Sequence, residues 1–197
     1  MDIFRFGLVN FYPLIETFPK YMNLCVAKAP DTEQGRIAKS WLAHNIKIER
    51  RHAQWYRDWA IGFGVSEKIF EKPINPPPEI DAVNNFLWRV CTYGSLVEAV
   101  AGLNYAIEGP TGVWTRLVYP NIKRFENRDG VGLDSKSLLW LRAHAVYDEV
   151  HPEEALEIIK TLAKSDNDRK GAIRAAKSGM DYYAMAAEAC YTLAAAA

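Results

Sequence analysis

Hydrophobic and polar positions recur at helical spacing along nearly the whole of this 197-residue chain. Residues 3–29 carry apolar side chains three or four positions apart, and two prolines are expected to start, kink or split this segment. The next helix is predicted to begin at an N-cap Asp31 and to end at Gly62 or Gly64. The sequence has no alternating strand pattern of any length and no internal repeat.

The middle of the chain predicts one long apolar helix with breaks on either side. Residues 66–70 are expected to form a short helical turn, and the proline-rich residues 72–78 a rigid connector. Residues 80–107 follow as a long, largely apolar helix. Residues 108–112, with the sequence Glu-Gly-Pro-Thr-Gly, are predicted to form a turn.

Residues 113–125 are expected to be helical, with an interruption at a proline. Three further helices are predicted in the rest of the chain. A surface loop at 126–132 precedes a helix capped by Asp134 or Ser135. Pro152 is expected to end or kink that helix and to start another. The last helix is predicted to begin near residue 169, with these residues inward: Ile173, Ala176, Met180, Tyr183, Ala187 and Tyr191. The fold predicted is an all-α, single-domain helical bundle of about seven helices over residues 1–197.

Three candidate metal ligands lie on one face of the helix that precedes Pro152. His144, Asp148 and His151 are spaced i, i+4 and i+7, which places them within roughly 60° of one another around the helix axis. Trp140 and Leu141 extend that face as apolar surface, so it is predicted to point inward. Buried charges and imidazoles need partners, which other helices must supply.

Two other helices offer such partners. Glu49 and His52 lie one turn apart among large apolar residues of the helix that follows Asp31. Glu98 is the only carboxylic acid between residues 87 and 107, on a face with small residues above and below it. Helical bundles that bind two irons combine carboxylates with Glu-x-x-His pairs, and Glu49-x-x-His52 is such a pair. Mixed nitrogen and oxygen donors fit iron or manganese and do not exclude zinc.

Each of these residues also has a purely structural interpretation. Glu49, beside Arg50 and Arg51, is typical of an exposed salt-bridge former, and His52 of a hydrogen-bonded core histidine. The ligand face around His144 could equally be an ordinary polar helix face. Three helices that each place such groups on an apolar face make the metal interpretation the stronger one.

Charge and cysteine content limit the classes of partner. The 24 Lys and Arg residues balance 24 Asp and Glu residues, so the protein lacks the basic surface that nucleic acid or an anionic membrane requires. Three widely spaced cysteines form no CxxC pair and no disulfide framework, which indicates a cytoplasmic location. The N-terminal residues lack a basic region typical of a signal peptide, and no apolar run approaches the ~20 residues of a membrane span.

Taken together, these segments resemble the haem-oxygenase-like superfamily that includes TenA and PqqC, and within it the di-iron oxidases and oxygenases. The resemblance covers residues 4–191 and depends on these elements: Glu49-x-x-His52, Glu98, and Trp140-Leu-x-x-His144-x-x-x-Asp148-x-x-His151-Pro. It implies a non-haem di-iron centre, with two Fe(II)/Fe(III) ions and no haem, that uses O2 as co-substrate. It also implies a homodimer and the possible use of an external electron donor.

The resemblance implies oxidation, or C–C or C–N cleavage, of a small amino-acid-like or fatty-acid-like substrate. The small-residue face around Glu98 is expected to admit this molecule, and aromatic residues to wall the pocket: Tyr12, Trp88, Gly94, Ser95, Tyr105 and Trp140, with Ala101 and Gly102. Two alternatives remain open. One is a metal-free TenA/PqqC-like enzyme acting on a thiamin-like or quinone-like molecule, and the other is a non-catalytic binding protein on the same fold.

Overall fold

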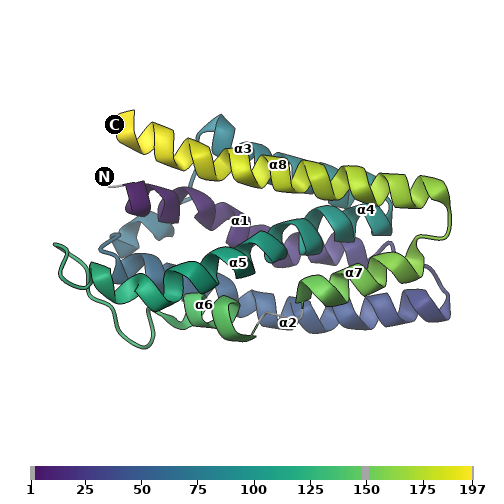
Figure 1. Cartoon of the computed structure of the whole chain (residues 1–197), viewed down its shortest axis with the longest axis horizontal. Coiled ribbons are helices and arrows are strands. Elements are labelled where there is room, and N and C mark those ends of the chain that lie inside the picture. The colour runs from purple at the N-terminus through teal and green to yellow at the C-terminus, as the bar shows by residue number, and fades with distance from the viewer. Residues whose placement is uncertain (1–2, 148–150, 197) are drawn as a thin grey trace.

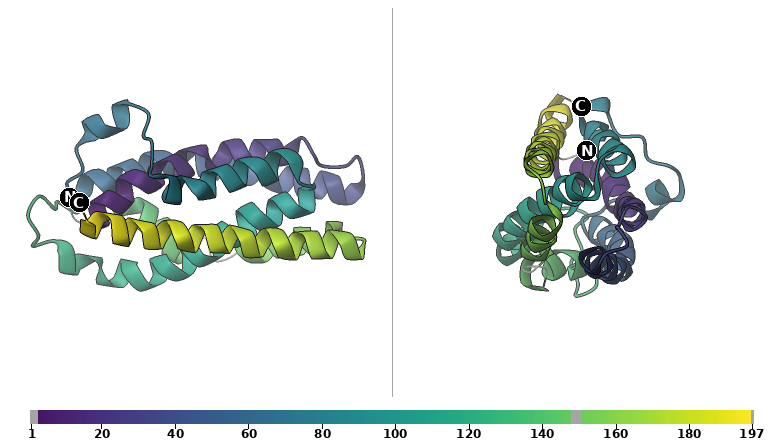
Figure 2. Two further views of the ribbon diagram at one scale, coloured as in Figure 1. Left: turned by 90° about the horizontal axis from the view of Figure 1, so that it is seen from above. Right: turned by 90° about the vertical axis from the view of Figure 1, so that its right-hand side faces the viewer.

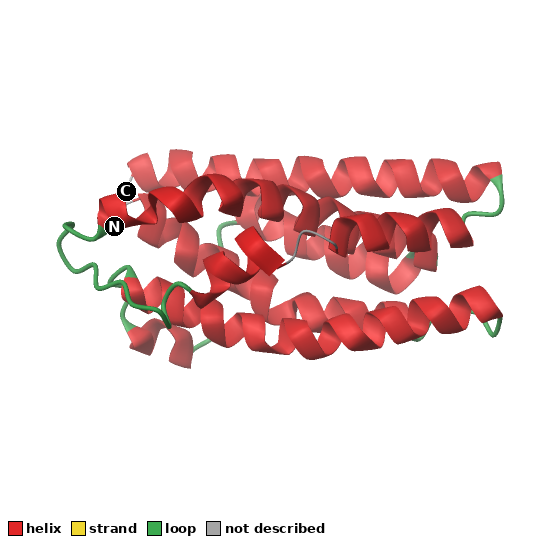
Figure 3. Ribbon diagram, turned by 60° about the horizontal axis from the view of Figure 1, so that its bottom comes forward, coloured by secondary structure: helices red, strands yellow, loops and turns green. Residues whose placement is uncertain are grey.

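A computed structural model describes residues 3–147 and 151–196 of the protein. Helices fill these residues, and loops are confined to the connections between them (Figures 1 and 3). Among the described residues there is no strand, so the predicted all-α bundle is confirmed. The elements are α1 (Ile3–Val26), α2 (Glu33–Gly62), η1 (Glu67–Glu71), α3 (Pro78–Tyr93), α4 (Leu96–Val100), η2 (Ala101–Glu108), α5 (Gly109–Val118), η3 (Tyr119–Phe125), α6 (Leu139–Arg142), η4 (Ala143–Tyr147), α7 (His151–Leu162) and α8 (Asp166–Ala196).

The long helices run along one axis and enclose the core between them. Figure 2 shows this bundle from above and end-on, with both chain ends at the same end of the molecule. α1 packs against α2 and α3, and α8 lies along η2, α3 and α4. None of the described helices is both long enough and apolar enough to cross a membrane.

The N-terminal helices follow the predicted pattern with two differences. Both prolines of α1 lie inside a helix that continues without a break. Thr32, and not Asp31, is the N-cap of α2, because its hydroxyl accepts a hydrogen bond from the backbone amide of Gly35. α2 ends at Gly62 as predicted, and residues 73–77 form the predicted non-helical connector.

The prediction of one helix over residues 80–107 is wrong. α3 ends at Tyr93, and Lys28 donates hydrogen bonds to the carbonyl groups of Thr92 and Gly94 just beyond its last turn. A new helix then begins at Ser95, whose hydroxyl accepts a hydrogen bond from the amide of Glu98 while the Glu98 carboxylate accepts one from the amide of Ser95. This reciprocal capping box is a strong helix start, which outweighs the apolar continuity of the sequence.

The predicted turn at residues 108–112 is also wrong, because the chain there remains helical. α4 continues into η2, a π-helical segment, and then into α5. Pro110 lies in the first turn of α5, and the Thr111 hydroxyl donates a hydrogen bond to the Ile107 carbonyl. A proline disrupts the hydrogen bonds of a regular helix. The wider π-turn before Pro110 accommodates the proline, so the helix continues from η2 into α5.

The inward face of α8 differs in part from the predicted one: Ala176 and Tyr183 pack against the core as predicted, but other predicted positions do not. Ile173 is 61% exposed and Tyr191 is 63% exposed, while the buried positions are small: Gly171, Ala172, Ala175, Gly179, Ala186 and Ala189. The helix also begins earlier than predicted, after a Ser165 cap. Small residues face inward because the backbones of α8 and η2 approach closely. A Cβ atom on Gly179 would lie only 2.7 Å from the Gly102 carbonyl oxygen of η2.

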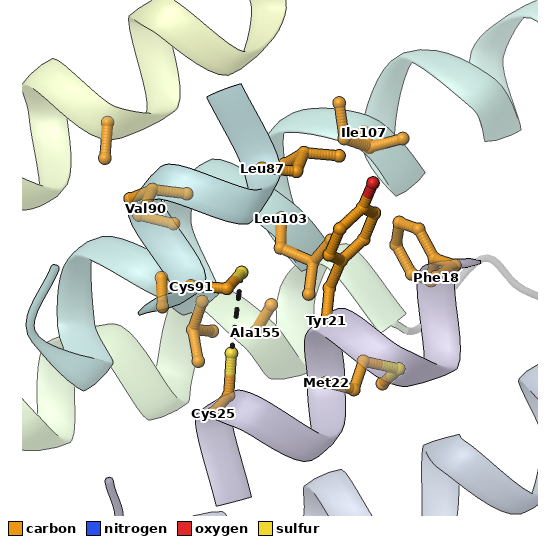
Figure 4. Close-up of a cluster of buried hydrophobic side chains, with 14 of the residues drawn as sticks. Phe18, Tyr21, Met22, Cys25, Leu87, Val90, Cys91, Leu103, Ile107 and Ala155 are labelled. Atoms are coloured by element: carbon orange, nitrogen blue, oxygen red, sulfur yellow. Dashed lines mark hydrogen bonds between the residues drawn. The ribbon is translucent and has the colours of Figure 1, made fainter. Parts of the chain in front are cut away.

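Two hydrophobic clusters make up the core, and they differ in chemistry. The larger is mainly aliphatic and joins α1, α2, α3, α4, η2, α7 and α8. Figure 4 shows part of it, where Tyr21 and Met22 pack near Leu103 and the sulfur atoms of Cys25 and Cys91 lie 3.8 Å apart. The smaller is rich in aromatic rings: Tyr12, Tyr56, Trp59, Phe63, Phe70 and Trp140.

We predict that Gly179→Ala destabilises the protein by roughly 1–3 kcal/mol, because the added methyl group overpacks the contact between α8 and η2. Gly132→Ala is the matched control, since a Cβ atom at that loop position meets nothing within 4 Å. Urea unfolding of both variants measures the difference. Equal stability of the two variants would contradict the close helix contact.

Candidate metal centre

α2 places a carboxylate and an imidazole in the interior of the bundle. Glu49 and His52 are one turn apart, so they leave the same face of the helix. Glu49 is 5% exposed and His52 is 1% exposed, and His52 Nδ1 lies 2.7 Å from Glu49 Oε2. The two residues lie on α2 between Ile46, which packs in the aliphatic cluster, and Tyr56, which packs in the aromatic one.

The π-helical segment η2 brings a second buried carboxylate to this volume. Glu108 Oε1 accepts a hydrogen bond of 2.7 Å from Asn104 Nδ2, one turn earlier. Glu108 Oε2 lies 3.3 Å from Nδ1 of His151, at the start of α7. Both side chains are about nine-tenths buried, with 11% and 12% of their surfaces exposed.

His144 is supplied by the second π-helical segment, η4. Its Nδ1 lies 2.8 Å from the Trp140 carbonyl oxygen, which can only accept, so Nδ1 carries the proton. The neutral ring therefore has its lone pair on Nε2, the tautomer in which many metal-bound histidines are held. The ring lies over the Trp140 indole, with centroids 4.1 Å apart, and 4.6 Å from the His52 ring.

The pKa values of these groups indicate strong mutual interaction. Burial and the charge of His52 lower the pKa of His144 to about 3, so this ring is neutral at ordinary pH. Burial alone would raise the pKa of Glu49, but the charge and hydrogen bond of His52, with His144 and His151, bring it below its usual value. Burial and the charge of Glu49 raise the pKa of Glu108, against the opposing effects of His151 and Asn104.

A small cavity of about 30 Å³ lies among these side chains. It is lined by Ile15, Phe18, Glu49, His52, Ile107, Glu108, Thr111, Trp140 and His144. A space of this size holds one or two water-sized species and no organic substrate. The polar part of its lining consists of carboxylates, imidazoles and one hydroxyl, which are groups that bind cations.

A larger cavity of about 530 Å³ adjoins the small one, and the two share Ile15 and Trp140. Its lining is mainly aromatic and aliphatic: Ile3, Phe4, Gly7, Leu8, Phe11, Ile15, Tyr56, Trp59, Pro110, Trp114, Trp140, Tyr183, Ala184, Ala187, Cys190 and Tyr191. The Tyr183 hydroxyl, on the large cavity, lies 3.0 Å from the Thr111 hydroxyl, on the small one. A ligand in the large cavity would therefore lie next to the carboxylate–imidazole cluster.

The structure brings together four of the six ligands predicted from the sequence: Glu49, His52, His144 and His151. Asp148 lies outside the described residues. The prediction that Glu98 is buried in apolar surroundings is wrong, since its side chain is 30% exposed and its carboxylate caps α4. Arg174 Nη2 is 3.9 Å from its Oε1 atom, on the side of α8.

Glu108 is the carboxylate that the sequence analysis missed. Glu108 falls in the predicted turn at residues 108–112, outside the helix that the sequence predicts to end at residue 107. A helix that continues through Pro110 instead puts Asn104, Glu108 and Thr111 on one face, at i, i+4 and i+7. That polar stripe at the end of an apolar run is the signal that could have identified it.

Most of the predicted substrate contacts lie away from both cavities. Trp140 lines both of them, and Tyr12 is buried in the aromatic cluster, edge-on to Phe70. Trp88 is 44% exposed, and Gly94 and Ser95 form the junction between α3 and α4. Tyr105 lines a separate surface hollow that also includes Arg116 and Met180. The space beside Gly102 is filled by Phe86 and α8, and so it does not open to a ligand.

The donor set matches the chemistry of a metal centre. Within residues 3–147 and 151–196 no three Cys, His, Asp or Glu side chains meet the geometric requirements of a metal site. The donors pair with one another instead, Glu49 with His52 and Glu108 with His151. Two carboxylates and two imidazoles line the ion-sized cavity, and His151 contacts one of the carboxylates, Glu108. This donor set suits a divalent ion of the iron or manganese type.

Comparison with known proteins identifies the family to which the chain belongs. Residues 5–184 match the family described as iron-containing redox enzymes. The chain belongs to this family. A search of curated proteins gives no match.

Solved structures support the same fold. A TenA homologue from Pseudomonas syringae pv. tomato is 31% identical, with a TM-score of 0.84 over 97% of this chain and 80% of its own. A domain of unknown function with a haem-oxygenase-like fold, from Shewanella denitrificans, is 17% identical, with a TM-score of 0.77 over 96% of this chain and 78% of that one. A TenA homologue from Pyrococcus furiosus is 18% identical, with a TM-score of 0.74 over 97% and 84%. The chain therefore has a haem-oxygenase-like fold.

We predict that the metal-free protein loses stability as the pH falls from about 6.5 towards about 3, in part through His144. Between these values the unfolded chain binds a proton at this position and the folded chain does not, so protonation favours unfolding. Denaturant titrations across that range should give a steeper pH dependence for wild type than for His144→Gln. Equal slopes would show that His144 is not buried in its neutral form.

Proposed function

We propose that this protein is a non-haem di-iron oxidase or oxygenase that activates O2 to oxidise, or to cleave a C–C or C–N bond in, a small amino-acid-like or fatty-acid-like molecule. The observation that carries the proposal is the convergence of two carboxylates and two imidazoles, from α2, η2 and η4, on one ion-sized cavity, with a third imidazole, His151 of α7, paired to Glu108. The family, described as iron-containing redox enzymes, supports iron as the metal.

Charge balance supports two ions in place of one. Glu49 and Glu108 bring two negative charges into a buried volume, and Asp148 would bring a third from the same helical face that the sequence predicts. Two Fe(II) ions carry four positive charges, so three carboxylates leave the filled site nearly neutral. A bound cation favours the ionised form of Glu108, whose pKa burial and Glu49 raise in the absence of metal.

The protein's own residues prepare the site for this role. The Trp140 carbonyl fixes the tautomer of His144, and Asn104 orients the Glu108 carboxylate. Ile15, Phe18 and Ile107 form apolar walls of the small cavity. When bound, the irons would supply O2 binding and reduction, which the protein side chains cannot provide.

The large cavity supports a substrate with an apolar body. Its walls are mostly carbon, while the hydroxyl groups of Tyr56 and Tyr183 offer polar contacts. A fatty acid or an amino acid with an apolar side chain fits this lining, with its reacting end directed past Trp140 towards the metal ligands. An external electron donor, a homodimer and a cytoplasmic location remain predictions from the sequence.

The main alternative is a metal-free TenA/PqqC-like enzyme, which the 31% identity to a TenA homologue favours. TenA-type catalysis relies on a cysteine nucleophile, and Cys190 lines the large cavity. Burial, however, raises the pKa of that thiol to about 11, so it is protonated at neutral pH and a poor nucleophile. Metal content separates the di-iron enzyme from this alternative and from a non-catalytic binding protein.

We predict that Glu108→Gln abolishes binding of at least one iron, while Glu98→Gln binds iron as wild type does. Gln keeps the hydrogen bond from Asn104 but removes the charge that holds the cation. A glutamine at position 98 still completes the capping box. Glu98→Gln is therefore a matched control in α4, which continues into η2. Anaerobic addition of Fe(II), removal of unbound metal and elemental analysis measure iron per chain.

Thermal melts of the same samples provide the second measurement. Iron that binds only the folded state raises the melting temperature of wild type and Glu98→Gln and leaves that of Glu108→Gln nearly unchanged. The metal-free Glu108→Gln protein should stay within about 1 kcal/mol of wild type or exceed it, because a costly buried charge is gone. Iron uptake by Glu108→Gln equal to that of wild type would refute the proposed centre.

We predict that Gly7→Leu weakens substrate binding without loss of iron. Gly7 lines the large cavity, where an added Cβ atom meets only Cys190 at 3.8 Å, so a leucine fits and fills part of the space. Melting temperatures with dodecanoate or phenylalanine report binding, since a ligand at 100 times its Kd adds about 2.7 kcal/mol. A ligand-induced shift that survives unchanged in Gly7→Leu would place the substrate elsewhere.

A further inference from the structure

A continuous line of aromatic rings joins the metal centre to the surface. The His144 ring lies 4.1 Å from the Trp140 indole, and Trp140 stacks on Trp59 with centroids 5.0 Å apart and planes 7° apart. Trp114 lies 5.9 Å from Trp59 and 6.4 Å from Trp140, so it contacts both members of the stacked pair. The three indoles come from α2, α5 and α6, three separate segments of the chain.

The two ends of this line differ in exposure. Trp59 is 1% exposed and Trp140 is 3% exposed, while Trp114 is 38% exposed and reaches solvent. Its helical neighbours Val113 and Leu117 are exposed as well, at 54% and 68%. The line therefore begins at a candidate metal ligand in the interior and ends at an indole that a dissolved molecule can touch.

The chemistry of these residues suits electron transfer. Tryptophan and tyrosine are among the side chains most easily oxidised by one electron, and rings in contact exchange electrons rapidly. Among the described residues, the indole N–H groups of Trp59 and Trp140 are buried without a hydrogen-bond partner. This lack of a described proton acceptor favours transfer of the electron vacancy to the next ring over loss of the indole proton.

We propose that Trp140, Trp59 and Trp114 form an electron relay that discharges the metal centre when O2 is reduced without substrate. This inference rests on the proposed function. Reduction of O2 to two waters consumes four electrons and four protons, the protons coming from solvent. Two electrons come from oxidation of two Fe(II) to Fe(III), and the other two normally come from the substrate. Without substrate they come through the relay, one at a time.

Each passage along the relay leaves the indoles unchanged. An electron leaves Trp140 for the metal centre, Trp59 refills Trp140, and Trp114 refills Trp59. A one-electron donor in solution, of the ascorbate class, then reduces Trp114 at the surface. No covalent bond forms or breaks in the protein, and the donor is the species oxidised overall. Without such a donor, the oxidising equivalent exchanges among the three indoles, and irreversible reaction with water or O2 takes place at Trp114, the exposed indole, and not at the metal ligands.

Metal-free protein provides the first test, which does not depend on iron. A photosensitiser in solution removes one electron from exposed tryptophans. Wild type and Trp88→Phe should form a persistent tryptophan radical cation, because the electron lost by Trp114 is replaced from the buried stacked pair. Trp88 is 44% exposed and contacts Tyr21 edge-on, away from the relay, so it is the matched control. Trp114→Phe should give only the neutral radical typical of exposed tryptophan.

Trp59→Phe breaks the inner part of the relay and leaves its exposed end in place. This variant should also lose the radical cation. It replaces Trp114→Phe in the test if that variant folds poorly. Circular dichroism and thermal melts establish the folding of each variant. Transient absorption separates the radical cation from the neutral radical. Identical radical spectra in wild type, Trp114→Phe and Trp59→Phe would overturn the relay.

Iron-loaded protein provides the second test. After exposure to O2 without substrate or donor, peptide mass spectrometry should locate oxidation at Trp114 in wild type and Trp88→Phe. In Trp114→Phe it should move inward to Trp59 and Trp140. Ascorbate should suppress the oxidation in wild type and Trp88→Phe but not in Trp114→Phe. Trp55, partly exposed and 5.3 Å from His52, is the competing exit, and oxidation there in every variant would overturn the proposal.

The two tests separate failure of the relay from failure of the proposed function. If iron-loaded protein consumes no O2, the di-iron assignment fails and the radical spectra of the metal-free protein decide the relay alone. If O2 is consumed but oxidation maps are the same in wild type and Trp114→Phe, the relay fails and the proposed function stands.

Discussion

Two carboxylates and three imidazoles share one buried volume in this protein, and a helical interior tolerates such a group only if its charges are compensated. The metal-free arrangement meets this requirement with two acid–imidazole pairs, Glu49 with His52 and Glu108 with His151. The compensation is incomplete, since burial and Glu49 still raise the pKa of Glu108. Bound cations, as in the proposed function, would complete this compensation, because a cation favours the ionised form of a neighbouring carboxylate.

Irregular helices deliver two of the five donors. Glu108 ends one π-helical segment and His144 lies in the other, while Glu49 and His52 come from the regular helix α2. Interruptions of this type change the direction in which later side chains leave the helix, and they are frequent at functional sites. At Glu108 the same wide turn also carries the chain into Pro110 without a break. One local feature therefore both keeps the helix continuous and supplies a candidate ligand.

Regular spacing predicted the fold and much of the site. Helical periodicity and the absence of strand patterns led to the all-α bundle, and Glu49, His52 and His144 were found because each lies in a simple i, i+3 or i, i+4 pattern beside large apolar residues. Three features could not be found that way. The Ser95–Glu98 capping box divides an apolar run, a proline is accommodated within a helix, and α8 turns its smallest side chains inward because it packs closely on η2.

The large apolar cavity, the stacked indoles and the ion-sized cavity all meet at Trp140, whose carbonyl also holds His144. The central claim is that metal ions occupy the small cavity. Crystals grown anaerobically with Fe(II), measured at the iron absorption edge, test it most directly. The account predicts anomalous density for iron among Glu49, His52, Glu108, His144 and His151. Iron-saturated crystals with no anomalous density in that cavity, or with density only at surface carboxylates such as Glu98, would contradict it.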